Sequence, residues 1–344
     1  MIKHSRRILI TGPAWVGDMV MAQSLFITLK KHDPKAHIDV LAPEWSIPLL
    51  KRMPEIAQGI TLPLGHGDLG LGIRWKIGRE LRKAHYDQAI ILPRSMKSAL
   101  IPFFSRARIR TGYLGEMRYG ILNDIRPLDK HILTQTVQRH VTLGLPRTAT
   151  LPPEIPRPKL TVNIENQQRL IDHFKLDNKT PTIALMPGAE YGPAKRWPEE
   201  HYAELTGMLM NEGFQVLIFG SEKEAPLADK IISLSGKEAL NLCGKTRLED
   251  AIDLIASCNA AVSNDSGLMH IAAAVNCPIV AIYGSSTPDY TPPLSENASI
   301  IYHRLDCSPC FKRECPLGHT DCLHGINAEE VYETLNPVIL RSKT

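Results

Sequence analysis

The residues of this chain with the clearest chemical potential lie in one stretch, Val262-Ser-Asn-Asp-Ser-Gly-Leu-Met-His270. An apolar strand runs into small polar residues and then into a helix, whose first N–H groups have no partner within the helix. Together with the helix dipole, these N–H groups predict a phosphate site at Ser266 and Gly267, flanked by Asp265 and His270. The same residues also suit a serine N-cap on an ordinary crossover helix, so the stretch does not decide its own function.

A second loop with glycines, Met186–Pro198, is expected at the same edge of a sheet. It leaves the apolar strand 182–185, contains Gly188 and ends at Lys195 and the next helix. A lysine there can supply positive charge to a departing diphosphate, a role that a divalent metal takes in many other transferases. The alternative is an Arg/Lys pair that only begins a helix. The stretch 283–289 follows another strand and adds small residues and backbone amides.

Strands alternate with helices along the whole chain, which predicts parallel, doubly wound sheets. The expected strands are 7–11, 38–41, 88–92, 182–185, 214–219, 260–262 and 279–283. The expected helices are 19–31, 45–51, 73–83, 165–174, 199–211, 225–234, 248–256, one from 266, and 328–340. The glycines of the first turn do not form Gly-x-Gly-x-x-Gly, so the dinucleotide fingerprint is absent there.

The 344 residues suffice for two domains, and the segment 145–159 contains five prolines that predict a stiff, extended linker. We therefore expect an N-terminal Rossmann-like domain over 1–158 and a second over 159–326. The final segment, 327–344, is expected to form a helix that packs back on the first domain. Two such domains facing a central cleft would place their ligands at the carboxyl ends of the strands.

The net charge of +4 is mild, but basic residues concentrate in the first half. They include Arg74, Lys76, Arg79, Arg82, Lys83, Arg94, Lys97, Arg106, Arg108, Arg110 and Arg118. The segment lacks the interleaved aromatic residues of a nucleic-acid stacking platform, so a phosphorylated substrate or an anionic membrane surface fits it better. A solvated basic helix face is the alternative. No apolar run approaches eighteen residues and no signal peptide is evident, which predicts a cytosolic protein.

Seven cysteines, an odd number, fit a reducing compartment. Three stand singly in apolar surroundings and are expected in the core: Cys243, Cys258 and Cys277. The other four have knuckle-like spacing, so a structural zinc is one interpretation: Cys307, Cys310, Cys315 and Cys322. This spacing matches no standard finger, and Pro309 and Pro316 favour a rigid surface loop, so we expect no metal.

Several motifs together carry a family resemblance. They are Gly12-Pro-Ala-Trp-Val-Gly-Asp-Met-Val, Pro63-Leu-Gly-His-Gly, Gly115-Glu-Met-Arg-Tyr-Gly, Pro187-Gly-Ala-Glu-Tyr-Gly-Pro-Ala-Lys-Arg-Trp-Pro, and Asn264-Asp-Ser-Gly-Leu-Met-His-Ile-Ala-Ala-Ala. With these motifs the chain resembles the ADP-heptose:lipopolysaccharide heptosyltransferases of glycosyltransferase family 9, and the type II members most. The resemblance extends from about residue 8 to residue 293, in the family's order.

The resemblance implies an α/β protein of the GT-B type that acts as an inverting, metal-independent glycosyltransferase without a cofactor. It would move L-glycero-D-manno-heptose from ADP-heptose onto the first heptose of a lipid A-linked inner core in lipopolysaccharide biosynthesis. The enzyme would be cytoplasmic and peripheral on the inner face of the inner membrane, and would bind no nucleic acid. Alternatives are a type I or III member, a nucleotide-sugar epimerase of similar architecture, or a zinc-dependent binding module.

An inverting transfer needs a base for the acceptor hydroxyl and a positive environment for the leaving diphosphate. By resemblance, Asp18 is the base, and Lys195 stabilises the leaving group with the amides after Ser266. The expected donor-binding residues are Gly188, Lys195, Glu224, Thr246, Asp265, Ser266, Gly267 and His270. The expected acceptor-binding residues are Arg94, Lys97 and Arg118. Catalysis would require closure of the cleft.

Overall fold

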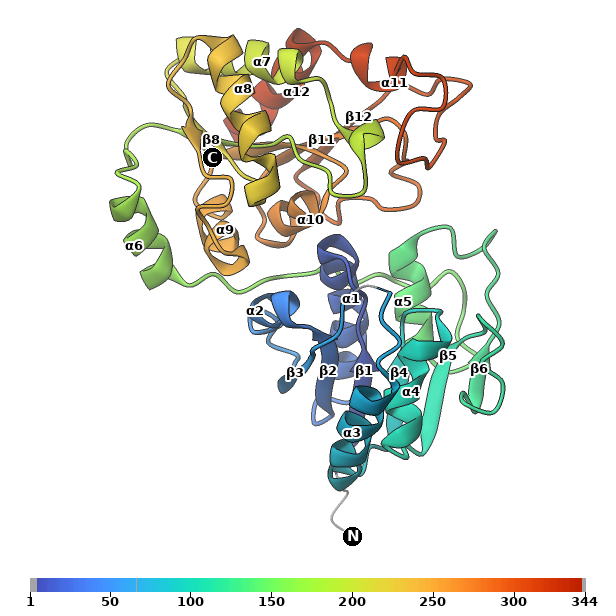
Figure 1. Ribbon diagram of the computed structural model, residues 1–344. Helices are drawn as coiled ribbons and strands as arrows, with labels where there is room; N and C mark the ends of the chain where they lie inside the picture. The colour runs from blue at the N-terminus through green and yellow to red at the C-terminus, as the bar shows by residue number, and fades with distance from the viewer. Residues whose placement is uncertain (1–4, 66, 342–344) are drawn as a thin grey trace. The chain divides into compact units, whose positions relative to one another are not determined.

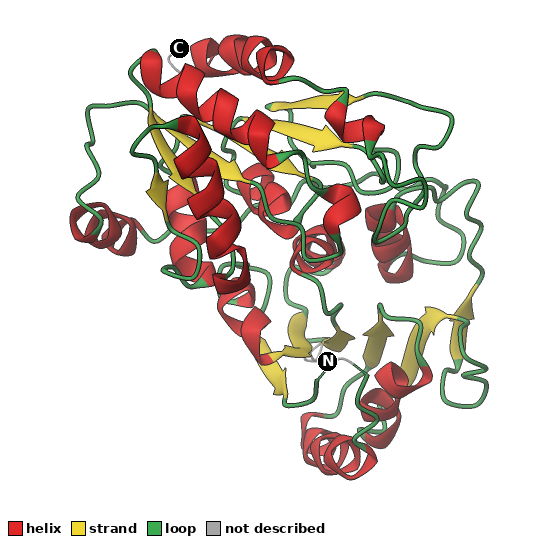
Figure 2. Ribbon diagram, turned by 45° about the horizontal axis from the view of Figure 1, so that its top comes forward, coloured by secondary structure: helices red, strands yellow, loops and turns green. Residues whose placement is uncertain are grey.

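The computed structural model describes residues 5–65 and 67–341. The chain divides into two compact units, Met1–Pro158 and Lys159–Thr344, and the division falls at the end of the proline-rich segment. Each unit contains one six-stranded sheet flanked by helices (Figures 1 and 2). The predicted α/β class with two doubly wound parallel sheets is therefore confirmed.

The sheet of the first unit has the order β3-β2-β1-β4-β5-β6, and every neighbouring pair is parallel. Its strands are β1 (Arg7–Thr11), β2 (His37–Pro43), β3 (Gln58–Leu62), β4 (Gln88–Ile91), β5 (Ile109–Tyr113) and β6 (Asp124–Arg126). Its α-helices are α1 (Val16–His32), α2 (Ile47–Leu50), α3 (Leu71–Leu81), α4 (Met96–Phe104) and α5 (Thr136–Gly144).

The central strands of this sheet are apolar along their length because helices cover both faces. Leu9 and Ile91 pack with Ala99 and Ile101 of α4 in one core cluster, and α3 packs beside α4. Ile8, which points to the other face, is also buried, and α1 packs beside α5. The right-handed crossover rule accounts for this division of the helices between the two faces.

The second unit repeats the arrangement, with the strand order β12-β11-β10-β7-β8-β9 and parallel pairing throughout. Its strands are β7 (Thr182–Met186), β8 (Gln215–Ile218), β9 (Leu240–Asn241), β10 (Ala260–Asn264), β11 (Ile279–Tyr283) and β12 (Ala298–Tyr302). Its α-helices are α6 (Ile164–His173), α7 (Glu199–Asn211), α8 (Ala225–Ser235), α9 (Leu248–Ile255), α10 (Gly267–Ala274), α11 (Asp321–His324) and α12 (Ala328–Arg341).

The last helix, α12, packs within the second unit, which corrects the expectation that segment 327–344 returns to the first domain. Val331, Leu335 and Ile339 of α12 are buried in the same cluster as the strands of the second sheet and α7. The amphipathic pattern of α12 predicts a buried face. It does not identify the surface that the face covers, and the nearest apolar surface along the chain is the second sheet.

Both sheets reverse their strand order at one point, between β1 and β4 in the first and between β7 and β10 in the second. Loops that leave two such neighbouring strands diverge, and ligands of open α/β sheets bind in the crevice between them. The loops predicted to carry Asp18, Lys195 and Asp265, and the loop with Arg94, follow these four strands. Among the helices within 5–65 and 67–341, none is long and apolar enough to cross a membrane.

Candidate functional site

A buried ion pair joins the two loops at the reversal point of the second sheet. Lys195, at the end of the loop after β7, places its Nζ 2.5 Å from Oδ2 of Asp265, directly after β10. Ser286 Oγ donates to the same carboxylate oxygen at 2.6 Å, and Thr291 Oγ1 lies 3.4 Å from Oδ1. Lys195 and Asp265, predicted from separate motifs, thus form one site, with two hydroxyl groups that received no role from the sequence.

Asn264 fixes the loop that carries Lys195. Its side-chain oxygen accepts from the backbone N–H of Trp197 at 3.0 Å and from the Tyr202 hydroxyl at 3.2 Å. Its side-chain nitrogen donates to the carbonyl of Pro187 at 2.7 Å. One buried amide therefore holds both ends of the loop against the end of β10. The sequence placed Asn264 in a motif but gave no reason to expect these partners.

The N-terminus of α10 has no side-chain cap. Ser266 occupies the N-cap position in extended conformation, but its side chain makes no capping hydrogen bond and its Oγ lies 3.2 Å from Ser263 Oγ. Gly267 begins the helix. The ordinary N-cap alternative is therefore not what this serine does, and the geometry suits an anion that accepts from the first N–H groups.

His270 lies one turn into α10 and is buried. Burial lowers the pKa of its imidazole to about 4, and Lys195 acts in the same direction while the charge of Asp265 opposes it. The ring is therefore neutral at neutral pH. It can donate or accept one hydrogen bond at each nitrogen, but it brings no positive charge to a phosphate.

Gly188 and Glu224 form a second contact at the carboxyl edge of this sheet. A Cβ on Gly188 would lie 1.8 Å from Oε1 of Glu224, so any other residue there would displace that carboxylate. Glu224 Oε2 accepts from the backbone N–H of Ser221 at 2.7 Å in the capping box before α8. Thr246 is half-buried in the loop between β9 and α9, and among residues 5–65 and 67–341 no hydrogen bond or ion pair links it to Lys195 or Asp265.

The cysteine-bearing loop contributes a second cation that the sequence did not predict. Tyr191 Oη donates to the carbonyl of Phe311 at 2.8 Å. The Tyr191 ring centroid is 5.2 Å from Lys195 Nζ and 5.4 Å from Arg313 Cζ, distances typical of cation–π contacts. The backbone N–H of Ala194 donates to the Arg313 carbonyl at 3.0 Å. The cysteine-bearing loop therefore packs against the Lys195 loop, and its Arg313 adds positive charge near Lys195.

The cysteines themselves form no disulfides. Within the part of the chain that the structure describes, no three His, Cys, Asp or Glu side chains form a group that could hold a metal ion. No such group therefore supports the zinc interpretation, although Cys307, Cys310 and Cys315 lie near Cys322: burial and then their charges raise the pKa of the Cys322 thiol to about 11. Cys243, Cys258 and Cys277 are buried core residues as predicted, and burial raises the pKa of the Cys243 and Cys277 thiols to about 12.

In the first unit, Asp18 and the loop after β4 lie at the two sides of the strand-order reversal. Asp18 is half-buried in the first turn of α1, where the helix dipole favours a negative charge. Arg94 is exposed before α4, and Lys97 is half-buried in the first turn of that helix. These three predicted residues therefore lie at the carboxyl edge of the first sheet.

Arg118, predicted as an acceptor-binding residue, is buried with 0% relative exposure. Its guanidinium donates to the carbonyl of Pro93 at 2.8 Å, the carbonyl of Ser95 at 3.2 Å and the carbonyl of Tyr113. Burial lowers its pKa to about 10, which still leaves it charged at neutral pH. The expectation that Arg118 contacts the acceptor directly is therefore corrected. Arg118 is buried and holds the loop that carries Arg94.

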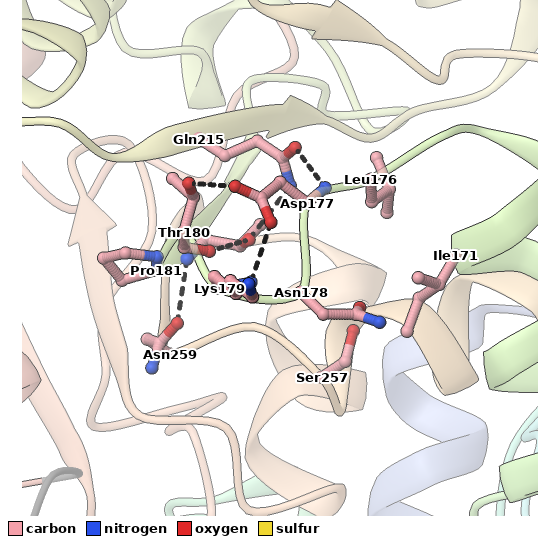
Figure 3. Close-up of a pocket in the computed structure, with 11 residues that line it drawn as sticks. Ile171, Leu176, Asp177, Asn178, Lys179, Thr180, Pro181, Gln215, Ser257 and Asn259 are labelled. Carbon is pink, nitrogen blue, oxygen red and sulfur yellow. Dashed lines mark hydrogen bonds between the residues drawn. The ribbon is translucent and has the colours of Figure 1, made fainter.

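A cavity of about 400 Å³ lies elsewhere, at the amino ends of β7 and β8 (Figure 3). Its polar lining is internally paired: Thr180 Oγ1 donates to Asp177 at 2.6 Å, and the N–H of Asp177 donates to the Gln215 side chain at 3.2 Å (Figure 3). None of the predicted site residues lines it. Because parallel sheets bind ligands at their carboxyl ends, this cavity is not the candidate site.

Comparison with known proteins identifies the family. A family model described as glycosyltransferase family 9 (heptosyltransferase) matches residues 74–321. The chain is 47% identical over 351 residues to lipopolysaccharide heptosyltransferase 2 of Escherichia coli K12, covering 98% of this chain and 99% of that one. The chain belongs to glycosyltransferase family 9.

Other relatives of this family agree. Lipooligosaccharide heptosyltransferase 2 of Haemophilus influenzae is 48% identical, with 97% of this chain and 99% of that one covered. The solved structure of E. coli ADP-heptose lps heptosyltransferase II superimposes with a TM-score of 0.88 at 42% identity, covering 98% of this chain and all of that one. The chain is therefore a glycosyltransferase with the GT-B type of fold, as its motifs predicted.

Buried His270 makes the second unit sensitive to acid. Its folded pKa of about 4 lies below the unfolded value near 6.5, so the unfolded chain binds more protons between these values. The contribution of the neutral ring is present above pH 6.5 and is lost as the pH falls toward about 4. We expect His270→Gln to flatten this part of the curve of unfolding free energy against pH, measured by denaturant titration of the full chain. Exposed His173→Gln is the control, and a pH-independent difference between wild type and His270→Gln would contradict the assignment.

Proposed function

We propose that this family-9 glycosyltransferase moves L-glycero-D-manno-heptose from ADP-heptose onto the first heptose of a lipid A-linked inner core. The transfer would be inverting and would need no metal. One observation carries the proposal: Lys195, paired with Asp265, lies beside the uncapped N-terminus of α10 at the strand-order reversal of the second sheet. The names of the relatives, which specify ADP-heptose and lipopolysaccharide, support this choice of donor and pathway.

In this proposal the second unit binds the donor. A lysine ammonium has three N–H donors, and Asp265 accepts one of them, so two can reach the oxygens of the diphosphate. The amides after Ser266 and Gly267 add the helix N-terminus. Gly188, Thr246 and Glu224 belong to the same donor set, and a carboxylate packed against a glycine backbone suits the hydroxyl groups of a nucleoside.

Asp265 acts on the donor through Lys195. Ser286 and Thr291 hold the carboxylate, and the carboxylate holds Nζ in place, so the cation is oriented before charge develops on the leaving diphosphate. A preoriented charge costs no reorganisation during the reaction. His270 stays neutral beside this pair and contributes hydrogen bonds rather than charge.

Asp18 of the first unit is the proposed base. A carboxylate in the first turn of a helix is stabilised in its charged form, which is the form that accepts the proton of the acceptor hydroxyl. Arg94 and Lys97 would meet the negative groups of the inner core. Since Asp18 and Lys195 belong to different units, the reaction requires both units to reach one pair of substrates.

The acceptor is a lipid, so we place the enzyme in the cytoplasm, peripheral on the inner face of the inner membrane. The basic surface of the first unit supports this localisation, because anionic lipid surfaces attract exposed lysine and arginine side chains.

The function is tested by incubating the purified full chain, in EDTA, with ADP-heptose and a panel of truncated inner-core acceptors. We expect ADP release and a heptosylated product only with the acceptor that ends in a single heptose. Donor alone should remain intact. Conversion of ADP-heptose without an acceptor would favour the epimerase alternative, a different preferred acceptor would favour a type I or III activity, and magnesium-dependent recovery of lost activity would exclude the metal-free mechanism.

Removal of the proposed base should affect turnover rather than donor binding. We expect Asp18→Asn to lower kcat by about 10²-fold or more, because an amide cannot accept the hydroxyl proton. ADP-heptose affinity, measured by calorimetry, should change by less than about twofold. The exposed carboxylate variant Glu154→Gln is the control. A kcat of Asp18→Asn near that of the control would remove Asp18 from the role.

The structure separates two kinds of acceptor-site variant. Lys97→Ala should raise the acceptor KM, more so at low salt, without a change in stability. Arg118→Ala should raise the acceptor KM too, but it should also lower the free energy of unfolding by about 2–4 kcal/mol, because a buried side chain and its charged hydrogen bonds to three carbonyl groups are lost. Steady-state kinetics and denaturant titrations measure both effects. A change confined to ADP-heptose affinity in either variant would contradict an acceptor role.

A further inference from the structure

Helix α3 exposes large apolar side chains on its outward side, in addition to Ile77 and Leu81, which pack inward against the core of the first unit. The side of α3 that packs on the protein buries Arg74 and Gly78, whereas Leu71 and Trp75 point outward with 52% and 46% of their surface exposed. Ile73, in the same helix, is exposed as well. Surface helices normally place apolar residues inward and charges outward, so this pattern needs a reason other than folding of the first unit.

The inward side of α3 is fixed by specific contacts. Arg74 Nε donates to the Leu69 carbonyl at 2.6 Å, and Nη1 donates to the Lys97 carbonyl at 3.1 Å. Gly78 lies so close to α4 that a Cβ would be 2.4 Å from the Cβ of Phe104. Figure 1 shows α3 against α4 in the first unit. The exposed apolar side chains are therefore held outward by the packing of the opposite side.

Basic residues accompany the apolar ones on the outward side. Lys76 and Arg79 of α3 are exposed, as is Lys83 in the turn directly after it, and Glu80 is the accompanying acidic residue. Arg79 Cζ lies 5.2 Å from the Trp75 ring centroid, which holds a cation over the indole. An apolar group with an exposed tryptophan, surrounded by lysine and arginine, matches the composition of helices that lie in the interface of a bilayer.

We propose that the outward side of α3, with Leu71 and Trp75 inserted and Lys76, Arg79 and the following Lys83 beside the head groups, docks the enzyme on an anionic lipid bilayer. The proposal rests on the proposed function, since a lipid-anchored acceptor is presented at a membrane. The basic charge complements anionic head groups and disfavours a second copy of the same basic surface, so we choose the bilayer as the occupant.

The test measures co-sedimentation of the full chain with vesicles. We expect binding to vesicles of phosphatidylglycerol and phosphatidylcholine in equal parts, and much weaker binding to phosphatidylcholine alone. Leu71→Ser with Trp75→Ser should reduce the bound fraction by about tenfold or more, because the inserted apolar area is lost. Lys76→Glu with Lys83→Glu should remove the preference for anionic vesicles, and raised salt should do the same to the wild type.

Matched controls lie in the same unit. Exposed Lys51 and Ile132 are away from α3, so Lys51→Glu with Ile132→Ser should bind vesicles like the wild type. Transfer to a deacylated, water-soluble inner-core acceptor should be unchanged in the Leu71/Trp75 variant, while transfer to the acceptor in vesicles should fall. This soluble assay separates failure of the docking proposal from failure of the proposed function.

Three outcomes would overturn the docking surface. The first is vesicle binding by the Leu71/Trp75 variant equal to that of the wild type. The second is an equal loss of activity on the soluble acceptor, which would assign α3 to the acceptor site. The third is a wild-type dimer, seen by sedimentation equilibrium, that becomes a monomer in the variant without a change in vesicle binding, which would assign the surface to a second copy of the chain.

Discussion

The reversal of strand order in each sheet is the constraint on which both candidate sites depend. Where two neighbouring parallel strands send their chains to opposite sides, their carboxyl ends leave a crevice that no crossover covers. In the second unit this crevice receives the loops after β7 and β10, and the ion pair of Lys195 and Asp265 joins those loops. In the first unit it receives Asp18 from one side and Arg94 and Lys97 from the other.

The ion pair is better explained by function than by stability. Desolvation of two charges offsets much of their attraction, and a buried pair is seldom more stable than apolar residues of similar volume. Here the carboxylate is satisfied by Lys195, Ser286 and Thr291, while two N–H donors of the ammonium remain for a ligand. The same low-dielectric surroundings keep His270 neutral, so Lys195 is the cation within this buried group, with Arg313 nearby at the surface.

The sequence predicted many of the apolar, regular elements, but it missed the apolar helix α4 as well as α5 and β12. Helix α7 and strand β11 have the expected bounds, because each is a periodic or continuous apolar run with clear ends. Strands β3 and β6 gave no such signal, since β3 is half-exposed and the three residues of β6 are polar or half-buried at a sheet edge. For α12, periodicity indicated a buried side but could not indicate which domain would cover it.

The motifs predicted which residues belong to the site, but they did not predict the contacts between those residues. Spacing identified Lys195 and Asp265 as members of two separate loops, but their pairing depends on the side-by-side position of β7 and β10, which only the sheet order fixes. The supporting residues Asn264, Ser286 and Tyr191 have common side chains whose partners are distant in sequence. No local pattern distinguishes such residues from ordinary loop residues.

In the basic segment, likewise, the sequence did not show which cations are exposed and which are buried. Arg74 and Arg118 add to the positive charge that the sequence predicts, yet both guanidinium groups are buried and donate to backbone carbonyls. Only the remaining cations can meet a ligand, and they include Arg94 and Lys97 after β4 and Lys76 and Arg79 on α3. Because Arg74 donates to the carbonyl of Lys97, the buried arginine ties α3 to the first turn of α4. A helix that rests on a bilayer would thereby fix the position of Lys97, the cation proposed to meet a lipid-anchored acceptor. This connection gives the exposed apolar side chains of α3 a place in the proposed transfer reaction.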